Sequence, residues 1–211
     1  MFTPTIYFPE IDSKTQTLAL EDSKLHHLKK VLRMKDFDNV NISNGEGQLY
    51  IGKLVNGSVE ITNQKNFQRK NKISIFIPYL REKNRFRFMV EKLTELNVHK
   101  IFIGKTENTQ NTNLDTLKIH NWALSALEQS GTPFFPKIET TETIDYKIFD
   151  TCFDITGSVL KKDSPNVNTF AIGPEGGWTP EELSKFKFKY KLSDFSLRTD
   201  TAAISAVSLM M

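Results

Sequence analysis

The sequence predicts an α/β protein in two parts: a small β-rich domain over residues 1–68 and a domain with a mostly parallel sheet over residues 69–211. Three observations support this. Short alternating segments with Asn-Gly turns fill the first third, apolar strands alternate with helical repeats beyond it, and a polar, basic stretch over 63–72 separates the two patterns. With 211 residues and 38% hydrophobic content, the chain can bury two modest cores.

The first domain is expected to be a small barrel or meander. Alternating segments lie around 40–43, 49–54 and 58–62, and Asn-Gly pairs between them supply the positive φ angles of tight hairpins. One short amphipathic helix is predicted over Ser23–Met34, with Ser23 as its N-cap. Its apolar side chains recur at helical spacing, namely Leu25, Leu28, Val31 and Leu32.

The second domain begins with a continuous apolar run over Ile73–Leu80, typical of a strand buried on both faces. A helix over 86–96 follows, and Asn97 suits its end because Asn tolerates the left-handed conformation. The remaining expected elements are a strand over 98–104, a helix over 117–130, strands at 152–157 and 169–172, a helix over 180–190, a short strand near Phe195 and a terminal helix from Asp200. This alternation predicts a mostly parallel sheet covered by helices.

Composition excludes several classes. No segment approaches the roughly 20 apolar residues of a membrane helix, and the N-terminus lacks the pattern of a signal peptide. Cys152 is the only cysteine, so no internal disulfide is possible, and no metal site is indicated. We therefore expect a cytoplasmic protein that neither associates with a membrane nor binds a metal ion.

Charge is distributed unevenly, although the net charge is only +3. Basic residues cluster over 24–35, 65–72 and 81–87. Lys and Arg clusters favour polyanion binding because each phosphate contact releases condensed counterions. A solvated helix face and a basic linker would produce the same pattern.

The most informative segment runs from Phe170 to Leu183. A buried strand leads into Gly173, Gly176 and Gly177, at the carboxyl end where parallel sheets bind ligands. The next residues form a capping box, with Thr179 at the N-cap, Pro180 at the first helical position and Glu182 three residues after the cap. The alternative is a tight turn and a capped helix without a ligand.

Phosphate is an unsuitable ligand for this loop. The loop contains no lysine, it matches neither common phosphate-binding glycine motif, and it is surrounded by Glu175, Glu181 and Glu182. Carboxylates suit a ligand that carries positive charge, such as the sulfonium and ammonium groups of S-adenosylmethionine.

A second segment, over 195–211, places Arg198 where a short strand is expected to meet the last helix. Arginine at such a junction can clamp a phosphate or a carboxylate. A surface ion pair is equally common.

These residues resemble the 16S ribosomal RNA uracil-N3 methyltransferases (the RsmE family) of the SPOUT class, over nearly the whole chain. The resemblance rests on five motifs in order: HHLKKVLRMK at 26–35, RFMVEKLTELNV at 87–98, ALEQS at 126–130, IGPEGGW at 172–178 and LRTDTAA at 197–203. The chain departs from the family pattern at Asn97, Thr132, Ser193 and Asp200.

The resemblance implies a PUA-like β-barrel for RNA, a SPOUT domain whose last helix forms a trefoil knot, and a homodimer acting on 16S ribosomal RNA or the small subunit. It places S-adenosyl-L-methionine between two loops, one side lined by Ile172, Gly173, Glu175, Gly176 and Gly177, the other by Leu192, Leu197, Arg198 and Thr199. The RNA-binding candidates are His26, His27, Lys30, Arg33 and Arg85.

The chemistry requires that the proton of uracil N3 leave before the nitrogen attacks the methyl group. Arg198 could stabilise the resulting anion or hold a phosphate, and Glu128, Gln129 or Glu175 could contact the base or its proton. Glu128 and Gln129 could equally serve as a helix cap or a dimer contact. The alternative functions are a methyltransferase of the same class acting on another RNA position and a protein that only binds RNA.

Overall fold

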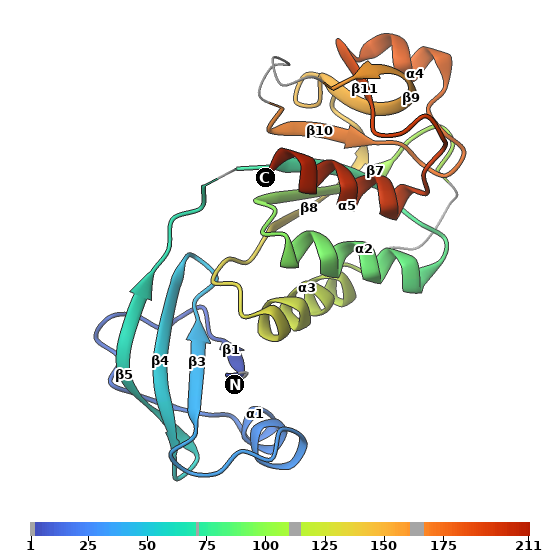
Figure 1. Ribbon diagram of the computed structural model, residues 1–211. Coiled ribbons are helices and arrows are strands. Elements are labelled where there is room, and N and C mark those ends of the chain that lie inside the picture. Colours follow the sequence, from blue (N-terminus) through green and yellow to red (C-terminus); the bar gives the residue numbers. More distant parts are fainter. Residues whose placement is uncertain (1–2, 71, 110–114, 161–166) are drawn as a thin grey trace. The chain divides into compact units, whose positions relative to one another are not determined.

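A computed structural model describes residues 3–70, 72–109, 115–160 and 167–211 (Figure 1). The chain divides into two compact units, Met1–Arg69 with Leu124–Phe135, and Lys70–Ala123 with Pro136–Met211. Residues 124–135 thus group with the first unit, although they lie in the second half of the sequence. The domain division at residues 68 and 69 stays a prediction.

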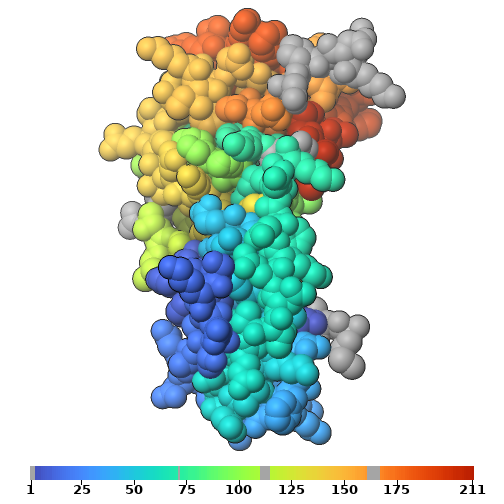
Figure 2. Space-filling view, turned by 90° about the vertical axis from the view of Figure 1, so that its left-hand side faces the viewer, coloured from blue at the N-terminus to red at the C-terminus, as the bar shows by residue number. Residues whose placement is uncertain are grey.

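The first unit contains a five-stranded sheet in the order β1-β3-β4-β5-β2. Strand β1 runs parallel to β3, and the other neighbours are antiparallel. The strands are β1 Thr5–Tyr7, β2 Thr17–Ala19, β3 Asn39–Ser43, β4 Gln48–Val55 and β5 Ser58–Asn66. The three predicted strands are present as β3, β4 and β5. In Figure 2 the side chains of β5 form a teal stretch at the surface of this unit.

The helical segment of this unit differs from the prediction. The α-helix α1 spans only Asp22–His26, and a π-helix, η1, continues over His27–Val31. Ser23 is not the N-cap; Glu21 occupies that position and makes no side-chain capping bond. The Leu32 N–H bonds to the His27 carbonyl five residues back. This wider turn leaves Leu28 buried and exposes Val31 and Leu32, which regular helical spacing would have placed on the same face.

The segment after helix α3 (Thr116–Ser130) extends the first unit. The Gly47 N–H donates to the Pro133 carbonyl at 2.8 Å, and the Phe135 N–H donates to the Gly45 carbonyl at 2.8 Å. The Phe135 ring stacks on Tyr7 with 5.3 Å between centroids. These contacts explain why residues beyond the helix belong to this unit.

Replacing Gly47 with alanine should destabilise the protein by about 2–4 kcal/mol. Gly47 has φ +99°, and an added Cβ would lie 2.7 Å from both the Phe134 ring and the Phe67 carbonyl oxygen. Gly57→Ala is the matched control, because Gly57 has φ +85° but faces only a Leu25 methyl group at 3.2 Å. Chemical denaturation measures the free energy of unfolding of both variants. Equal losses would show that backbone strain alone decides the effect.

The second unit is built on a six-stranded sheet in the order β11-β9-β10-β6-β7-β8, with all neighbouring strands parallel. Helices α2 and α5 lie side by side (Figure 1). The strands are β6 Ser74–Pro78, β7 Lys100–Lys105, β8 Lys137–Thr143, β9 Thr151–Val159, β10 Thr169–Ile172 and β11 Phe188–Lys191, and the helices are α2 Lys83–Glu95, α4 Pro180–Lys185 and α5 Thr199–Met210. The predicted mostly parallel sheet is confirmed.

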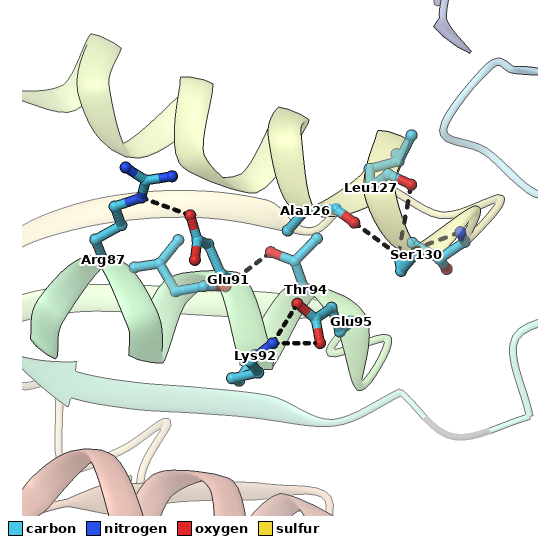
Figure 3. A network of polar contacts seen from close by, with 10 residues as sticks. Arg87, Glu91, Lys92, Thr94, Glu95, Ala126, Leu127 and Ser130 are labelled. Carbon is cyan, nitrogen blue, oxygen red and sulfur yellow. Dashed lines mark hydrogen bonds and ion pairs between the residues drawn. The ribbon is translucent and has the colours of Figure 1, made fainter. Parts of the chain in front are cut away.

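Helix α2 ends as the sequence predicts. Asn97 adopts φ +60°, its N–H bonds to the Thr94 carbonyl, and the Val98 N–H reaches back to the Leu93 carbonyl. Within the helix, Thr94 donates its hydroxyl to the Val90 carbonyl, and the ion pairs Arg87 with Glu91 and Lys92 with Glu95 lie along its surface (Figure 3).

Two predictions near the C-terminus were wrong. The helix that begins at Pro180 ends at Lys185 instead of continuing to residue 190, and β11 follows it. Phe186 and Tyr190 are buried while lysines alternate with them, so the two-residue period of a strand prevails over the helical reading. Phe195 lies in no strand and is 81% exposed. The knot stays a prediction.

Within the described ranges, every helix is too short or too polar to cross a membrane.

Candidate functional site: two loops and a helix start at the carboxyl ends of the strands

The glycine loop follows β10 directly, at the carboxyl end of a central parallel strand. The Gly177 N–H bonds to the Pro174 carbonyl at 2.9 Å, and Gly177 has φ +72°. A Cβ on Gly173 would lie 2.8 Å from the indole nitrogen of Trp178, whose ring is buried. The loop therefore needs glycine at 173 for close packing and at 177 for its backbone conformation.

The capping box after the loop is present as predicted. The Thr179 hydroxyl accepts from the Glu182 N–H at 3.2 Å, and the Glu182 carboxylate accepts from the Thr179 N–H at 2.9 Å. The second oxygen of Glu182 accepts from the Glu107 N–H at 3.0 Å, and the residue is only 2% exposed. Glu182 thus joins the loop after β7 to the loop after β10.

Asn108 holds the same two loops together from the outside. Its side-chain amide donates to the Gly176 carbonyl at 3.3 Å and to the Gly177 carbonyl at 3.0 Å. Sequence reasoning did not select Asn108. Its place three residues after β7 was the available signal, because polar side chains at the carboxyl ends of parallel strands meet at one edge of the sheet.

The second motif, at the start of α5, contacts the glycine loop. The Thr199 hydroxyl donates to the Gly173 carbonyl at 3.0 Å, and Thr199 is buried. The two segments that the sequence analysis assigned to the donor are therefore in direct contact. Leu192 is half-buried, and Leu197 is exposed.

Arg198 directly precedes this helix and is exposed. Across the part of the chain that the structure describes, its guanidinium forms no ion pair. Its charge is consequently available to an anion.

Arg85 links the loop and the helix through its guanidinium. It binds the Asp200 carboxylate with two hydrogen bonds, of 3.1 Å from Nε and 2.5 Å from a terminal nitrogen, and it also binds Glu175. The side chains of Arg85 and Asp200 are each 14% exposed. Two carboxylates face one cation, so this cluster keeps one net negative charge beside the glycine loop.

The pKa values reflect this arrangement. The hydrogen bond with Asp200 raises the pKa of Arg85, and the contact with Glu175 adds to it despite partial burial. Burial by itself would raise the pKa of Asp200, but the hydrogen bonds from Arg85 and from the Thr201 N–H hold it below its ordinary value. Both groups are charged at neutral pH.

The remaining sequence candidates lie in the first unit. Glu128 accepts from the Tyr7 N–H at 2.9 Å and pairs with Lys24 at 3.2 Å, and Lys24 also donates to the Tyr7 carbonyl. Gln129, His26, His27, Lys30 and Arg33 are exposed. Glu128 therefore connects α3 to β1, and the Arg85 guanidinium is bound by two carboxylates. The catalytic roles predicted for Glu128 and Gln129, and the RNA-binding roles predicted for Arg85, His26, His27, Lys30 and Arg33, stay predictions.

Comparison with known proteins decides the family. A family model described as an RNA methyltransferase domain matches residues 68–211, and one described as an RNA methyltransferase PUA domain matches residues 20–62. Ribosomal RNA small subunit methyltransferase E of Buchnera aphidicola (subsp. Schizaphis graminum) is 30% identical over 236 residues, which cover 98% of this chain and 95% of that protein. The chain belongs to the ribosomal RNA small subunit methyltransferase E family.

Other proteins of the same name are also similar to this chain. The Rickettsia conorii protein of the same name is 26% identical, covering 89% of this chain and 86% of that one. A crystal structure of ribosomal RNA small subunit methyltransferase E from Neisseria gonorrhoeae, bound to S-adenosyl methionine, is similar with a TM-score of 0.85 and 25% identity, covering 99% and 97% of the two chains. The predicted family, the α/β class with a PUA-like N-terminal unit, and RNA methyltransferase activity are confirmed.

Proposed function

We propose that this chain transfers the methyl group of S-adenosylmethionine to N3 of a specific uridine in 16S ribosomal RNA of the small subunit. The observation that carries the proposal is the contact between the two donor motifs, made by the Thr199 hydroxyl on the Gly173 carbonyl. Glycines let a ligand approach the backbone of this loop closely. The net negative charge of the Arg85 cluster suits a sulfonium and an ammonium group.

In the proposed reaction, water takes the proton from uracil N3 and the nitrogen attacks the methyl carbon. A carbon–nitrogen bond forms as the carbon–sulfur bond breaks, and S-adenosylhomocysteine departs uncharged at sulfur. Arg198 is the proposed stabiliser of the uracil anion, because it lies within the second donor segment, directly before α5, and its exposed guanidinium has no carboxylate partner within the described ranges.

We further propose a homodimer in the cytoplasm. Leu209, near the end of α5, is 62% exposed, as expected of a side chain that a second copy covers. Sedimentation equilibrium of the full chain measures the mass directly, and a monomer at all concentrations would contradict this part of the proposal.

The test of the reaction uses purified full-length protein, labelled S-adenosylmethionine and small subunits that lack the modification. Digestion and mass spectrometry of the RNA identify the product, and the expected nucleoside is 3-methyluridine. Another methylated nucleoside would support the alternative, a methyltransferase of this class with a different target. Donor binding without any transfer would contradict the enzymatic proposal.

A further inference from the structure

A cavity of about 430 Å³ lies within the first unit, far along the sequence from the donor motifs. Strand β1, helices α1 and η1, and the second half of α3 contribute to it. Its apolar walls include Ile6, Leu28 and Leu32, and its volume lies in the range of small-molecule pockets, roughly 300–1,000 Å³. The donor motifs belong to the other unit, so the proposed methyl transfer gives this cavity no role.

The polar side chains of the cavity include one ion pair and several hydroxyl and amide groups. Lys24 and Glu128 pair with each other, whereas Ser125 and Gln129 are exposed polar side chains of α3. Thr5 also lines the cavity, and its buried hydroxyl has no hydrogen-bond partner among the described residues. Apolar walls with amide and hydroxyl groups suit a flat heterocycle better than a phosphate.

The backbone beside the cavity is unusual in two ways. The π-helix η1 carries His27 and Leu28 into the wall, and π-turns occur frequently at functional sites. Arg33 and Phe37 then adopt φ angles of 56° and 74°, a conformation that non-glycine side chains rarely adopt and that clusters at ligand-binding sites.

A second cavity, of about 560 Å³, adjoins the first, since Pro4 and Leu32 line both. Arg33, Lys35 and Phe37 contribute to its walls, and Phe37 is 69% exposed. An exposed aromatic ring that shares a cavity wall with two cations is a combination that single-stranded RNA binding uses, because the ring stacks on a base and the cations bind the backbone.

We propose that the first cavity binds one unstacked base of the RNA substrate, and that Phe37 stacks on a neighbouring base while Arg33 and Lys35 hold the adjoining phosphates. Gln129, Ser125 and the Thr5 hydroxyl supply donors and acceptors for the edge of the base. The inference rests on the proposed function only in taking RNA as the ligand.

Ser125→Trp tests the proposal by filling the cavity from an exposed position on α3. We expect the variant to bind unmodified 16S ribosomal RNA about tenfold more weakly, the loss typical of one stacked base. The plot of log affinity against log salt concentration should shift without changing slope, because no phosphate contact is lost. Arg33→Gln should instead lower the slope by about one.

Asn121→Trp is the matched control, because Asn121 is an exposed residue one turn earlier on the same helix and is absent from the cavity wall. Thermal melting and calorimetric titration with S-adenosylmethionine should be unchanged in both tryptophan variants. RNA affinity within twofold of the parent in Ser125→Trp would overturn the inference, even if the enzyme forms 3-methyluridine. Weaker RNA binding with a different methylated product would leave the inference standing and contradict the proposed function.

Discussion

Arg198→Met should lower the rate of methyl transfer to the RNA by about 10²–10³, with almost no change in the affinity for S-adenosylmethionine. The guanidinium is exposed and has no carboxylate partner within the described ranges, so its charge is free to stabilise the anion that develops on uracil. The loss should therefore appear in kcat under saturating donor and RNA. Single-turnover kinetics with labelled donor, beside calorimetric titration, separate the two quantities.

Two controls make this result specific. Arg198→Lys keeps a positive charge and should recover part of the rate, although a single ammonium cannot present the planar fork of arginine. Arg87→Met removes an arginine from an exposed helical ion pair with Glu91 and should leave the rate within twofold. A uniform loss of RNA affinity in Arg198→Met at an unchanged kcat would instead identify Arg198 as a phosphate contact.

Arg85→Met should weaken S-adenosylmethionine binding by roughly 10–100-fold and destabilise the protein by about 2–4 kcal/mol. The substitution leaves Asp200 largely buried and without its partner, beside Glu175, so the two proposed donor segments lose one of their connections and keep the hydrogen bond from Thr199 to Gly173. Calorimetric titration and chemical denaturation measure the two effects. Arg87→Met, two residues along the same helix, is again the control.

The same variant has a pH signature. The pKa of Asp200 lies below its ordinary value in the folded protein, so the ion pair contributes its full stability above about pH 4, near the unfolded pKa of aspartate. That contribution disappears as pH falls from there through the lower folded pKa. Arg85→Met should therefore show a smaller loss of Tm between pH 5 and pH 3 than the parent. An equally steep loss would mean that the pair adds nothing to stability.

These measurements also decide between two roles of Arg85. The sequence analysis placed it among the RNA-binding candidates because of the basic run over 81–87. A phosphate contact would weaken RNA binding and lower its salt slope by about one, while donor affinity stayed constant. If Arg85 instead positions the donor segments, its removal should weaken S-adenosylmethionine binding and leave RNA affinity and its salt slope unchanged.

Local features were predictable because their causes lie within a few residues. The capping box of Thr179, Pro180 and Glu182 and the left-handed Asn97 follow from backbone hydrogen bonding over one helical turn. The turn at 173–177 was predictable for a different reason, since glycines after a buried strand leave few alternatives to a turn at the sheet edge. Its role in donor binding stays a proposal.

Contacts between distant residues were not predictable from these patterns. Arg85 and Asp200 are 115 positions apart, and Glu128 and Tyr7 are 121 apart. A basic run indicates charge but not the carboxylates that fold against it. The predicted end of α4 was wrong because helix formers and an alternating Phe-Lys pattern overlap there, and pairing of Phe188–Lys191 with β9 selects the strand.

The parallel sheet has a consequence for synthesis on the ribosome. Strand β6, whose Ile75, Phe76 and Ile77 are fully buried, pairs on one side with β7 and on the other with β10, which emerges about a hundred residues later. Helix α2 packs against α5, which follows it by about a hundred residues. A nascent chain should thus expose the apolar edge of β6 until β10 has been synthesised, and such an exposed edge favours aggregation.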